Sequence, residues 1–181
     1  ASLAINAALT GHLVLATVHT NSAAGTIPRL IDMGVEPFLL SSTLRVTIGQ
    51  RLVRRLKDGY GEARTLTQDE RKQLSKHADL DAVLENLQAE GFLKSSASWN
   101  GVTFKNVPAD TAEDAYQGRS GIHEVLPVSD TIKDMMMKEA TADEVEAQAR
   151  SEGMLTMLED GILKAAQGHT TIEEVLRVVS E

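Results

Sequence analysis

Residues 8–23 read ALTGHLVLATVHTNSA, and the apolar run from Leu13 to Val18 within them indicates the class of fold. This run is short, almost continuous in apolar residues, and is followed directly by the polar residues His19, Thr20 and Asn21. Such a run is typical of a strand that is buried on both faces of a parallel sheet. We therefore expect a buried strand over Leu13–Val18.

Helical and extended patterns surround this run. Before it, Ala1–Gly11 has the pattern of the end of an Ala-rich helix, which predicts that the chain begins inside a larger protein. After it, capping signals predict a helix that ends at Gly34 and a short helix that Pro37 opens. Residues 45–56 then alternate as a strand does. Helix, buried strand, two helices and a strand indicate an α/β fold.

The pattern changes between Lys57 and Gln117, which we predict to be a small folded insertion. Thr67 and Glu70 are spaced as a capping box. Residues 80–91 predict one amphipathic helix, and the turn-rich residues that follow predict a small hairpin over 99–104. The insertion therefore has secondary structure of its own.

The C-terminal part returns to a strand and then becomes helical. Residues 118–126 have strand character. Four short helices follow, and capping boxes at Thr141 and Thr171 mark the starts of the second and the fourth. We expect these helices to form one compact, bundle-like subdomain over residues 129–181.

The composition excludes several classes of protein. A chain of 181 residues fits one ordinary domain or two small ones. It contains no cysteine, so neither a disulfide framework nor a Cys-ligated zinc site can form. The formal net charge of -8 argues against sequence-independent binding of nucleic acid. No apolar run reaches the roughly 18 residues of a membrane span, and no leader opens the chain, so we expect a soluble protein.

Two histidines flank the apolar run. His12 and His19 are seven residues apart, which on a strand would place them on opposite faces and prevent them from chelating one metal ion. Thr17 and His19 would share a face at the carboxyl end of the strand, where open α/β sheets place ligands. On these residues alone, a ligand-binding role and an ordinary structural role are equally supported.

The segment 8–23 resembles the His box of the secretion-ATPase superfamily, which includes the ATPases of type IV pilus assembly and type II secretion. Further blocks resemble the matching blocks of these ATPases in the same order. They are RLIDMGVEPFL (29–39), GQRLVRRL (49–56), GRSGIHEVLPV (118–128) and EDGILKAAQGHTTIEEVLRVV (159–179).

The resemblance implies an α/β fold that is the C-terminal half of a P-loop NTPase core, with an inserted small subdomain and a C-terminal all-helical subdomain. Residues 1–56 and 118–128 would belong to the core, 57–117 to an insertion equivalent to the family's tetracysteine element, and 129–181 to the helical domain. The chain has no GxxxxGK[ST] loop, which would precede it in such a protein. We therefore expect ATP hydrolysis with Mg²⁺ in the intact protein and an inactive fragment here.

The resemblance also implies roles for individual residues. Three residues fall on the His-box positions that face the γ-phosphate and couple its loss to movement: His12, Thr17 and His19. Asn21 could orient a water molecule or a neighbouring loop. Gln50 and Arg51 match a family strand near the nucleotide, although a solvated strand edge is at least as well supported for them.

The chain departs from the family at the tetracysteine element. Its Cys-x-x-Cys pairs would fall at Lys57 and Tyr60 and at Pro108 and Thr111. Without these thiolates we predict no zinc. A hydrophobic core could replace the metal, and four aromatic residues could supply it: Phe92, Trp99, Phe104 and Tyr116.

The function implied is that of a homohexameric motor in the cytoplasm, peripheral at the inner membrane, where it would contact a platform protein of the pilus or secretion machine. Two alternatives stay open: a non-catalytic module for oligomerisation or partner docking, and a DNA-uptake or conjugation motor. The basic residues Arg51, Arg54 and Arg55 lack interleaved aromatic residues, so we expect them to pair with a carboxylate or a neighbouring subunit rather than with nucleic acid.

Overall fold

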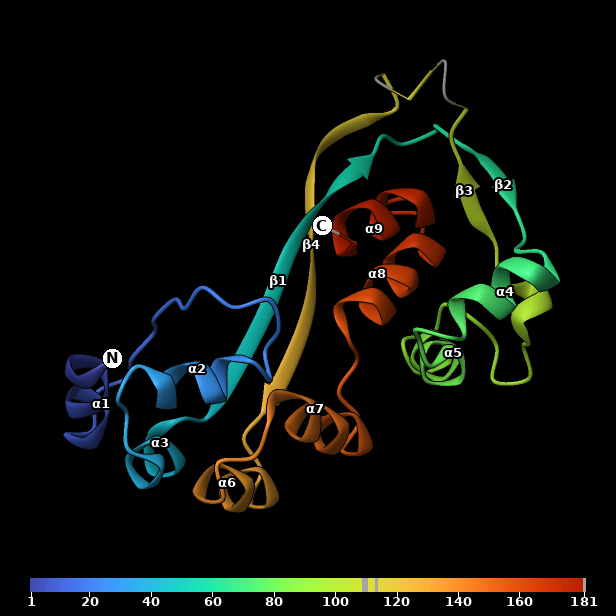
Figure 1. Ribbon diagram of the computed structural model, residues 1–181. Coiled ribbons are helices and arrows are strands. Elements are labelled where there is room, and N and C mark those ends of the chain that lie inside the picture. Colours follow the sequence, from blue (N-terminus) through green and yellow to red (C-terminus); the bar gives the residue numbers. More distant parts are fainter. Residues whose placement is uncertain (109–110, 113, 181) are drawn as a thin grey trace. The chain divides into compact units, whose positions relative to one another are not determined.

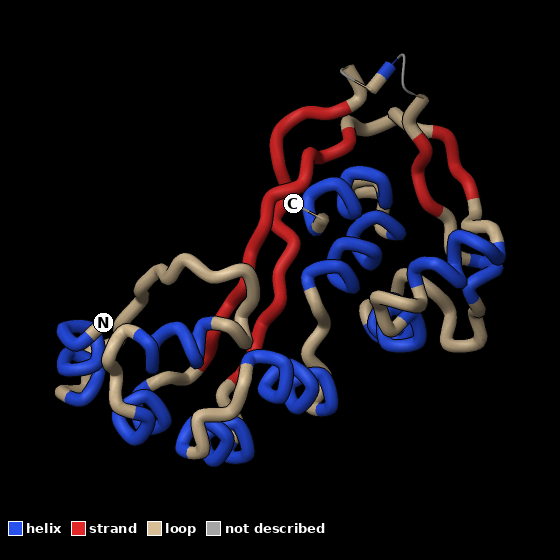
Figure 2. Tube along the Cα trace, viewed as in Figure 1, coloured by secondary structure: helices blue, strands red, loops and turns tan. Residues whose placement is uncertain are grey.

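The computed structural model describes residues 1–108, 111–112 and 114–180, and it confirms the expected α/β class (Figure 1, Figure 2). Its elements follow one another along the chain as α1 (Ser2–Leu9), α2 (Thr26–Asp32), α3 (Pro37–Thr43), β1 (Val46–Leu56), β2 (Glu62–Arg64), α4 (Gln68–Leu74), α5 (Leu80–Ala89), the 3-10 helix η1 (Trp99–Gly101), β3 (Phe104–Asn106), β4 (Tyr116–Pro127), α6 (Asp130–Met137), α7 (Ala142–Ser151), α8 (Met157–Ala166) and α9 (Ile172–Val179).

The chain divides into two compact units, each with its own hydrophobic core. Unit 1 comprises Ala1–Gly49 and Glu124–Met154, and unit 2 comprises Gln50–His123 and Leu155–Glu181. The predicted domain boundaries do not coincide with this division and stay a prediction. Helices α6 and α7 belong to unit 1 and helices α8 and α9 to unit 2, so the predicted single helical subdomain is shared between the two.

Two long strands run from one unit into the other. β1 and β4 form a two-stranded sheet, and backbone hydrogen bonds show that it is antiparallel: Val128 N–H donates to Arg45 O (2.9 Å) and Lys57 N–H donates to Ala115 O (2.9 Å). β2 and β3 form a second antiparallel pair, in which Arg64 lies opposite Phe104. The parallel sheet that we expected is absent from the described residues.

The prediction of a buried strand over Leu13–Val18 was wrong. Residues 12–20 have no regular secondary structure, and Leu13 and Leu15 are 91% and 88% exposed. A buried strand needs hydrogen-bonded neighbours for its backbone. Among the described residues, no strand pairs with this segment. The apolar pattern is therefore present without the partners that would bury it.

The predicted helix starts are confirmed by their capping bonds. The side chains of Thr67 and Thr141 each accept the N–H of the glutamate three residues later, and that glutamate bonds back to the capping residue. Thr171 likewise accepts the N–H of Glu174. These bonds satisfy N–H groups that the first turn of a helix leaves without partners. No helix in the described parts of the chain has the length and apolarity needed to cross a membrane.

The predicted hairpin over 99–104 was wrong. Phe104 pairs instead with Arg64, forty residues earlier, because residues Trp99–Gly101 form a 3-10 turn. Trp99 stacks on Phe104 with ring centroids 6.4 Å apart. Of the aromatic residues expected to replace the zinc site, Phe104 and Trp99 join the core of unit 2, whereas Phe92 is 54% exposed.

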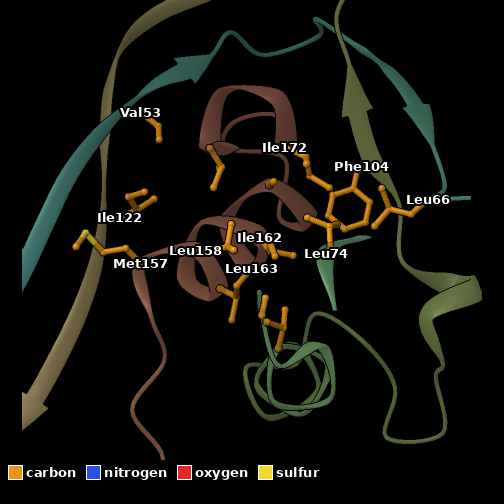
Figure 3. Packing of buried hydrophobic residues seen from close by; sticks show 14 of the residues in the cluster. Val53, Leu66, Leu74, Phe104, Ile122, Met157, Leu158, Ile162, Leu163 and Ile172 are labelled. Atoms are coloured by element: carbon orange, nitrogen blue, oxygen red, sulfur yellow. The ribbon is translucent and has the colours of Figure 1, made fainter. Parts of the chain in front are cut away.

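Each core is built from the apolar faces of short helices. In unit 1, α3 packs against α6, and both α6 and α2 contact α7. The large buried side chains of this cluster include Ile27, Leu40, Ile132, Met136 and Val145. In unit 2, α8 is the central element and contacts α9, α5 and β3. Figure 3 shows this core, with Phe104, Ile162 and Ile172 among the side chains that converge on it.

The contact of α8 with α9 depends on Gly161, which has no side chain to separate the helices. A Cβ built at this position would lie 2.3 Å from Val175 Cγ1 and 3.1 Å from Val175 Cγ2. Both distances are shorter than ordinary van der Waals contact between carbon atoms. Val175 is fully buried, so its side chain has no free space to move into. Only glycine therefore fits this crossing without a shift of the helices.

We predict that Gly161→Ala lowers the free energy of unfolding by about 1–2 kcal/mol. Overpacking costs about 1–3 kcal/mol, and the better helix propensity of alanine returns at most about 1 kcal/mol. Chemical denaturation measures the difference. Gly101→Ala is the matched control, since a Cβ there would meet nothing within 4 Å. Equal stability of the two variants would contradict the prediction.

Candidate functional site

The six residues predicted for the site lie in different units and differ in exposure. His12, Thr17, His19 and Asn21 belong to unit 1 and are exposed, whereas Gln50 and Arg51 belong to unit 2. Among the described residues, no hydrogen bond joins any two of the four side chains in unit 1. The structure therefore leaves them accessible but does not assemble them into a bonded cluster.

His12 is held by the end of helix α1. Its N–H donates to Ala7 O (3.1 Å), and its Nδ1 lies 3.0 Å from Thr10 Oγ1 and 3.3 Å from Ala7 O. These contacts satisfy carbonyl groups that the last turn of a helix leaves free. In this structure, His12 thus has a local role at a helix end, and its expected role toward phosphate stays a prediction.

The residues after His19 form a closely hydrogen-bonded turn, which we call the 20–26 turn. Thr20 Oγ1 lies 3.1 Å from Thr26 Oγ1 and donates to Ser22 O (3.1 Å). Gly25 N–H donates to Ser22 Oγ (3.0 Å). These side-chain bonds to nearby backbone are typical of Ser/Thr turns. His19 is therefore exposed at the edge of a fixed structure.

Two buried side chains attach the 20–26 turn to the long strands. The Ala23 N–H donates to Glu124 Oε1, and Thr47 Oγ1 donates to Ala23 O (3.1 Å). Ala23 is fully buried, and Glu124 is only 5% exposed. Together they satisfy both backbone groups of Ala23, which the interior would otherwise leave without water.

Glu124 and Thr47 were not predicted from the sequence. A signal was present, because Ile122, Glu124 and Leu126 alternate along β4 and all three are buried. A single carboxylate at an inward position of an apolar strand needs a buried donor. That reasoning identifies Glu124 as a residue with a specific partner, although it does not identify the partner.

The two weaker candidates have different surroundings. Gln50 is exposed on β1. The Arg51 guanidinium donates to Val178 O at the end of α9. A cation at a helix C-terminus is favoured by the helix dipole and satisfies a terminal carbonyl. In this structure Arg51 therefore binds the end of α9, which differs from the solvated strand edge considered for it, and its expected place near the nucleotide stays a prediction.

Of the three basic residues of β1, Arg54 pairs with a carboxylate as expected. Arg54 donates from Nε (3.0 Å) and from a terminal nitrogen (2.8 Å) to Glu174 Oε2, and Arg177 donates to the same carboxylate at 2.7 Å and 3.1 Å. The Glu174 side chain is fully buried, while both arginine side chains are about half exposed. Burial raises the pKa of Glu174, but the hydrogen bonds from Arg177 and Arg54 outweigh it and lower the pKa from 4.5 to about 2.

Glu174 also covers the edge of β1. The Arg54 N–H donates to Glu174 Oε1 (3.0 Å), Thr170 Oγ1 donates to Arg54 O (2.8 Å), and the Leu56 N–H donates to His169 O (2.9 Å). The loop before α9 and its first turn thus take the place of a neighbouring strand. An edge paired in this way cannot accept a strand from another chain.

At the positions where the resemblance places cysteines, one backbone hydrogen bond joins the two residues of each pair. Tyr60 N–H donates to Lys57 O (3.2 Å), and Thr111 N–H donates to Pro108 O (3.1 Å). The Lys57 ammonium lies 5.5 Å from the centre of the Tyr60 ring. Within the described residues, no group of three or more His, Cys, Asp or Glu side chains could hold a metal ion.

Comparison with known proteins identifies the family. The sequence model of the family described as Type II/IV secretion system protein matches residues 1–177. The chain belongs to this family. It is 41% identical over 181 residues to the type II secretion system protein E of Xanthomonas campestris pv. campestris, covering 100% of this chain and 29% of that protein. It is 39% identical over 176 residues to the type IV pilus assembly ATPase PilB of Thermus thermophilus, covering 97% of this chain and 18% of PilB.

A solved structure supports the fold. The ATPase DotB of Legionella pneumophila matches with a TM-score of 0.53 and 20% identity, over 99% of this chain and 35% of that chain. The present chain thus spans less than a third of the length of the two relatives named above. It spans about a third of the length of DotB. The resemblance inferred from the sequence blocks is confirmed.

We predict that the contribution of Glu174 to stability depends on acid pH. Because its pKa is lowered in the folded state, the stabilisation is fully present above pH 4.5 and is lost as the pH falls toward about 2. Glu174→Gln should lower the free energy of unfolding by about 1–3 kcal/mol at pH 7, a range discounted for the exposed arginines.

Chemical denaturation of both proteins at pH 7 and pH 3 tests this prediction, and the gap should narrow at pH 3. Glu173→Gln is the control, because Glu173 is about half exposed and pairs only at the surface with Arg64. A surface pair contributes about 0–1 kcal/mol. A gap for Glu174→Gln that is equally large at both values of pH would contradict the assignment.

Proposed function

We propose that this chain is part of a motor ATPase that powers type IV pilus assembly or type II protein secretion. The observation that carries the proposal is the match of residues 1–177 to the secretion family, together with 39–41% identity to a type II secretion protein E and to the pilus assembly ATPase PilB. The likeness to DotB adds the fold of an ATPase. The intact protein would convert ATP to ADP and phosphate.

The intact motor would be a homohexamer that uses ATP with Mg²⁺ and binds neither zinc nor nucleic acid. It would lie in the cytoplasm, peripheral at the inner membrane, and contact the platform protein of the machine that it drives. We propose the division inferred from the sequence for this assembly: core residues 1–56 and 118–128, insertion 57–117 and helical domain 129–181. The net charge of -8 supports a protein rather than a nucleic-acid partner.

The exposed segment before the 20–26 turn supplies groups that suit a phosphate. The Thr17 hydroxyl can donate to a phosphate oxygen, and the His19 imidazole can donate a hydrogen bond or hold a proton. Asn21 offers an amide donor and acceptor within the 20–26 turn, and its side chain is exposed. Bound Mg²⁺ would neutralise charge on the phosphates.

We predict that Thr17→Ala and His19→Ala each lower kcat of the intact ATPase about 100-fold, the usual scale for loss of a charge-stabilising or proton-holding group. The rate of phosphate release at saturating ATP measures the effect. Thr103→Ala and His77→Ala are matched controls at exposed positions of unit 2. Wild-type rates in both Thr17 and His19 variants would contradict the assignment.

We predict that the 181-residue chain alone does not hydrolyse ATP, because it has no GxxxxGK[ST] loop. Release of radiolabelled phosphate should not exceed that of a heat-denatured sample, whereas the intact protein should be active. Turnover by the isolated chain that Thr17→Ala abolishes would contradict this expectation.

A further inference from the structure

We propose that Glu124 is a positioning residue for the segment that ends at His19. This inference rests on the proposed ATPase function. Glu124 acts through the backbone of the 20–26 turn and does not itself touch the nucleotide. Its carboxylate fixes the point at which the chain leaves His19 and Asn21, so that their side chains keep one direction relative to the strand β4.

Glu124 binds the backbone of this turn. The Ala23 N–H donates to Glu124 Oε1, and Ala23 is four residues after His19. The bond joins residues 101 apart in sequence, so it fixes a tertiary relation rather than a local one. Thr47 binds the opposite backbone group of Ala23, and the internal bonds of Thr20 and Thr26 make the turn stiff between them.

The absence of a side chain at Gly49 leaves space for the Glu124 carboxylate. A Cβ at position 49 would lie 2.7 Å from Glu124 Cγ and 2.8 Å from its Oε1. Gly49 is in β1, directly beside Glu124 of β4, and only glycine allows the carboxylate to occupy this place. The glycine in the strand is therefore explained by the close approach of a side chain.

The contact between Gly49 and Glu124 lies where both strands reach the boundary of unit 1. Gly49 and Glu124 are the residues at which β1 and β4 leave unit 1, since unit 2 begins at Gln50 and ends this part at His123. The turn after His19 is thus bound to β4 at Glu124, the first residue of that strand's part in unit 1, and to β1 at Thr47, two residues before Gly49. A change at His19 that moves the turn would act directly on these strands, which suits the conversion of phosphate loss into movement.

The inference is tested in the intact ATPase with three variants. Glu124→Ala removes the acceptor, Gly49→Ala displaces it, and Glu124→Gln keeps a weaker, neutral acceptor. We expect kcat to fall at least 10-fold in the first two with KM for ATP within twofold of wild type, and an intermediate kcat for Glu124→Gln. Hydrogen exchange at the Ala23 amide should be faster in the variants with the lower kcat.

Glu159→Gln is the matched control. Glu159 is also a buried glutamate that accepts a backbone N–H, that of Asp79 (2.6 Å), but it belongs to unit 2, whereas the 20–26 turn belongs to unit 1. It should lose thermal stability and keep kcat within twofold. A kcat loss in Glu159→Gln equal to that of Glu124→Ala would overturn the inference, because general destabilisation would then explain both.

The remaining outcomes also decide. An inactive wild-type protein would refute the proposed function and not the placement of Glu124. An active wild type with unchanged kcat in Glu124→Gln and Gly49→Ala would overturn the positioning role. If Glu124→Ala does not fold, the latter two variants carry the test, since one keeps the acceptor and the other keeps the glutamate.

Discussion

Buried carboxylates that accept backbone N–H groups connect distant segments in both units. A carboxylate loses its water on burial and is stable there only where donors replace that water. Glu124 meets the Ala23 N–H in unit 1, whereas Glu159 meets the Asp79 N–H and Glu174 meets the Arg54 N–H in unit 2. Each bond joins a helix, turn or strand to a segment more than 75 residues away in sequence. These bonds therefore determine which segments pack together around the apolar cores.

These contacts also separate two kinds of polar interaction in the chain. Glu174 is surrounded by two arginines and keeps its charge into strong acid, since its pKa is about 2. The ion pairs of Arg64 with Glu70 and Glu173 lie at the surface, where water and salt weaken them. The first kind sets which segments meet, and the second adds little to that choice.

Much of the local structure could be predicted from the sequence. The spacing of Thr67 and Thr141 from the glutamate three residues later predicts the start of each helix. Residues 45–56 and 118–126 have strand patterns, and they lie in β1 and β4. The errors occur where a partner decides the outcome. Leu13–Val18 has the pattern of a buried strand but no strand beside it among the described residues, and Phe104 pairs with Arg64 rather than near Trp99. For the site, the motif indicated His12, Thr17 and His19. The partner of Glu124 is Ala23, which is 101 residues away in sequence, and residue spacing cannot predict such a contact.

The strand β1 and the segment Leu13–Val18 differ in their tendency toward self-association. The edge of β1 near Arg54 and Leu56 is closed by side chains and carbonyls of the 169–174 segment, so it offers no template to another molecule. Leu13–Val18 is uncharged, rich in β-forming residues and exposed at Leu13 and Leu15. Segments of this kind stack into cross-β aggregates. The chain thus combines a strand edge that its own fold protects from self-association with an exposed apolar segment that has no such protection.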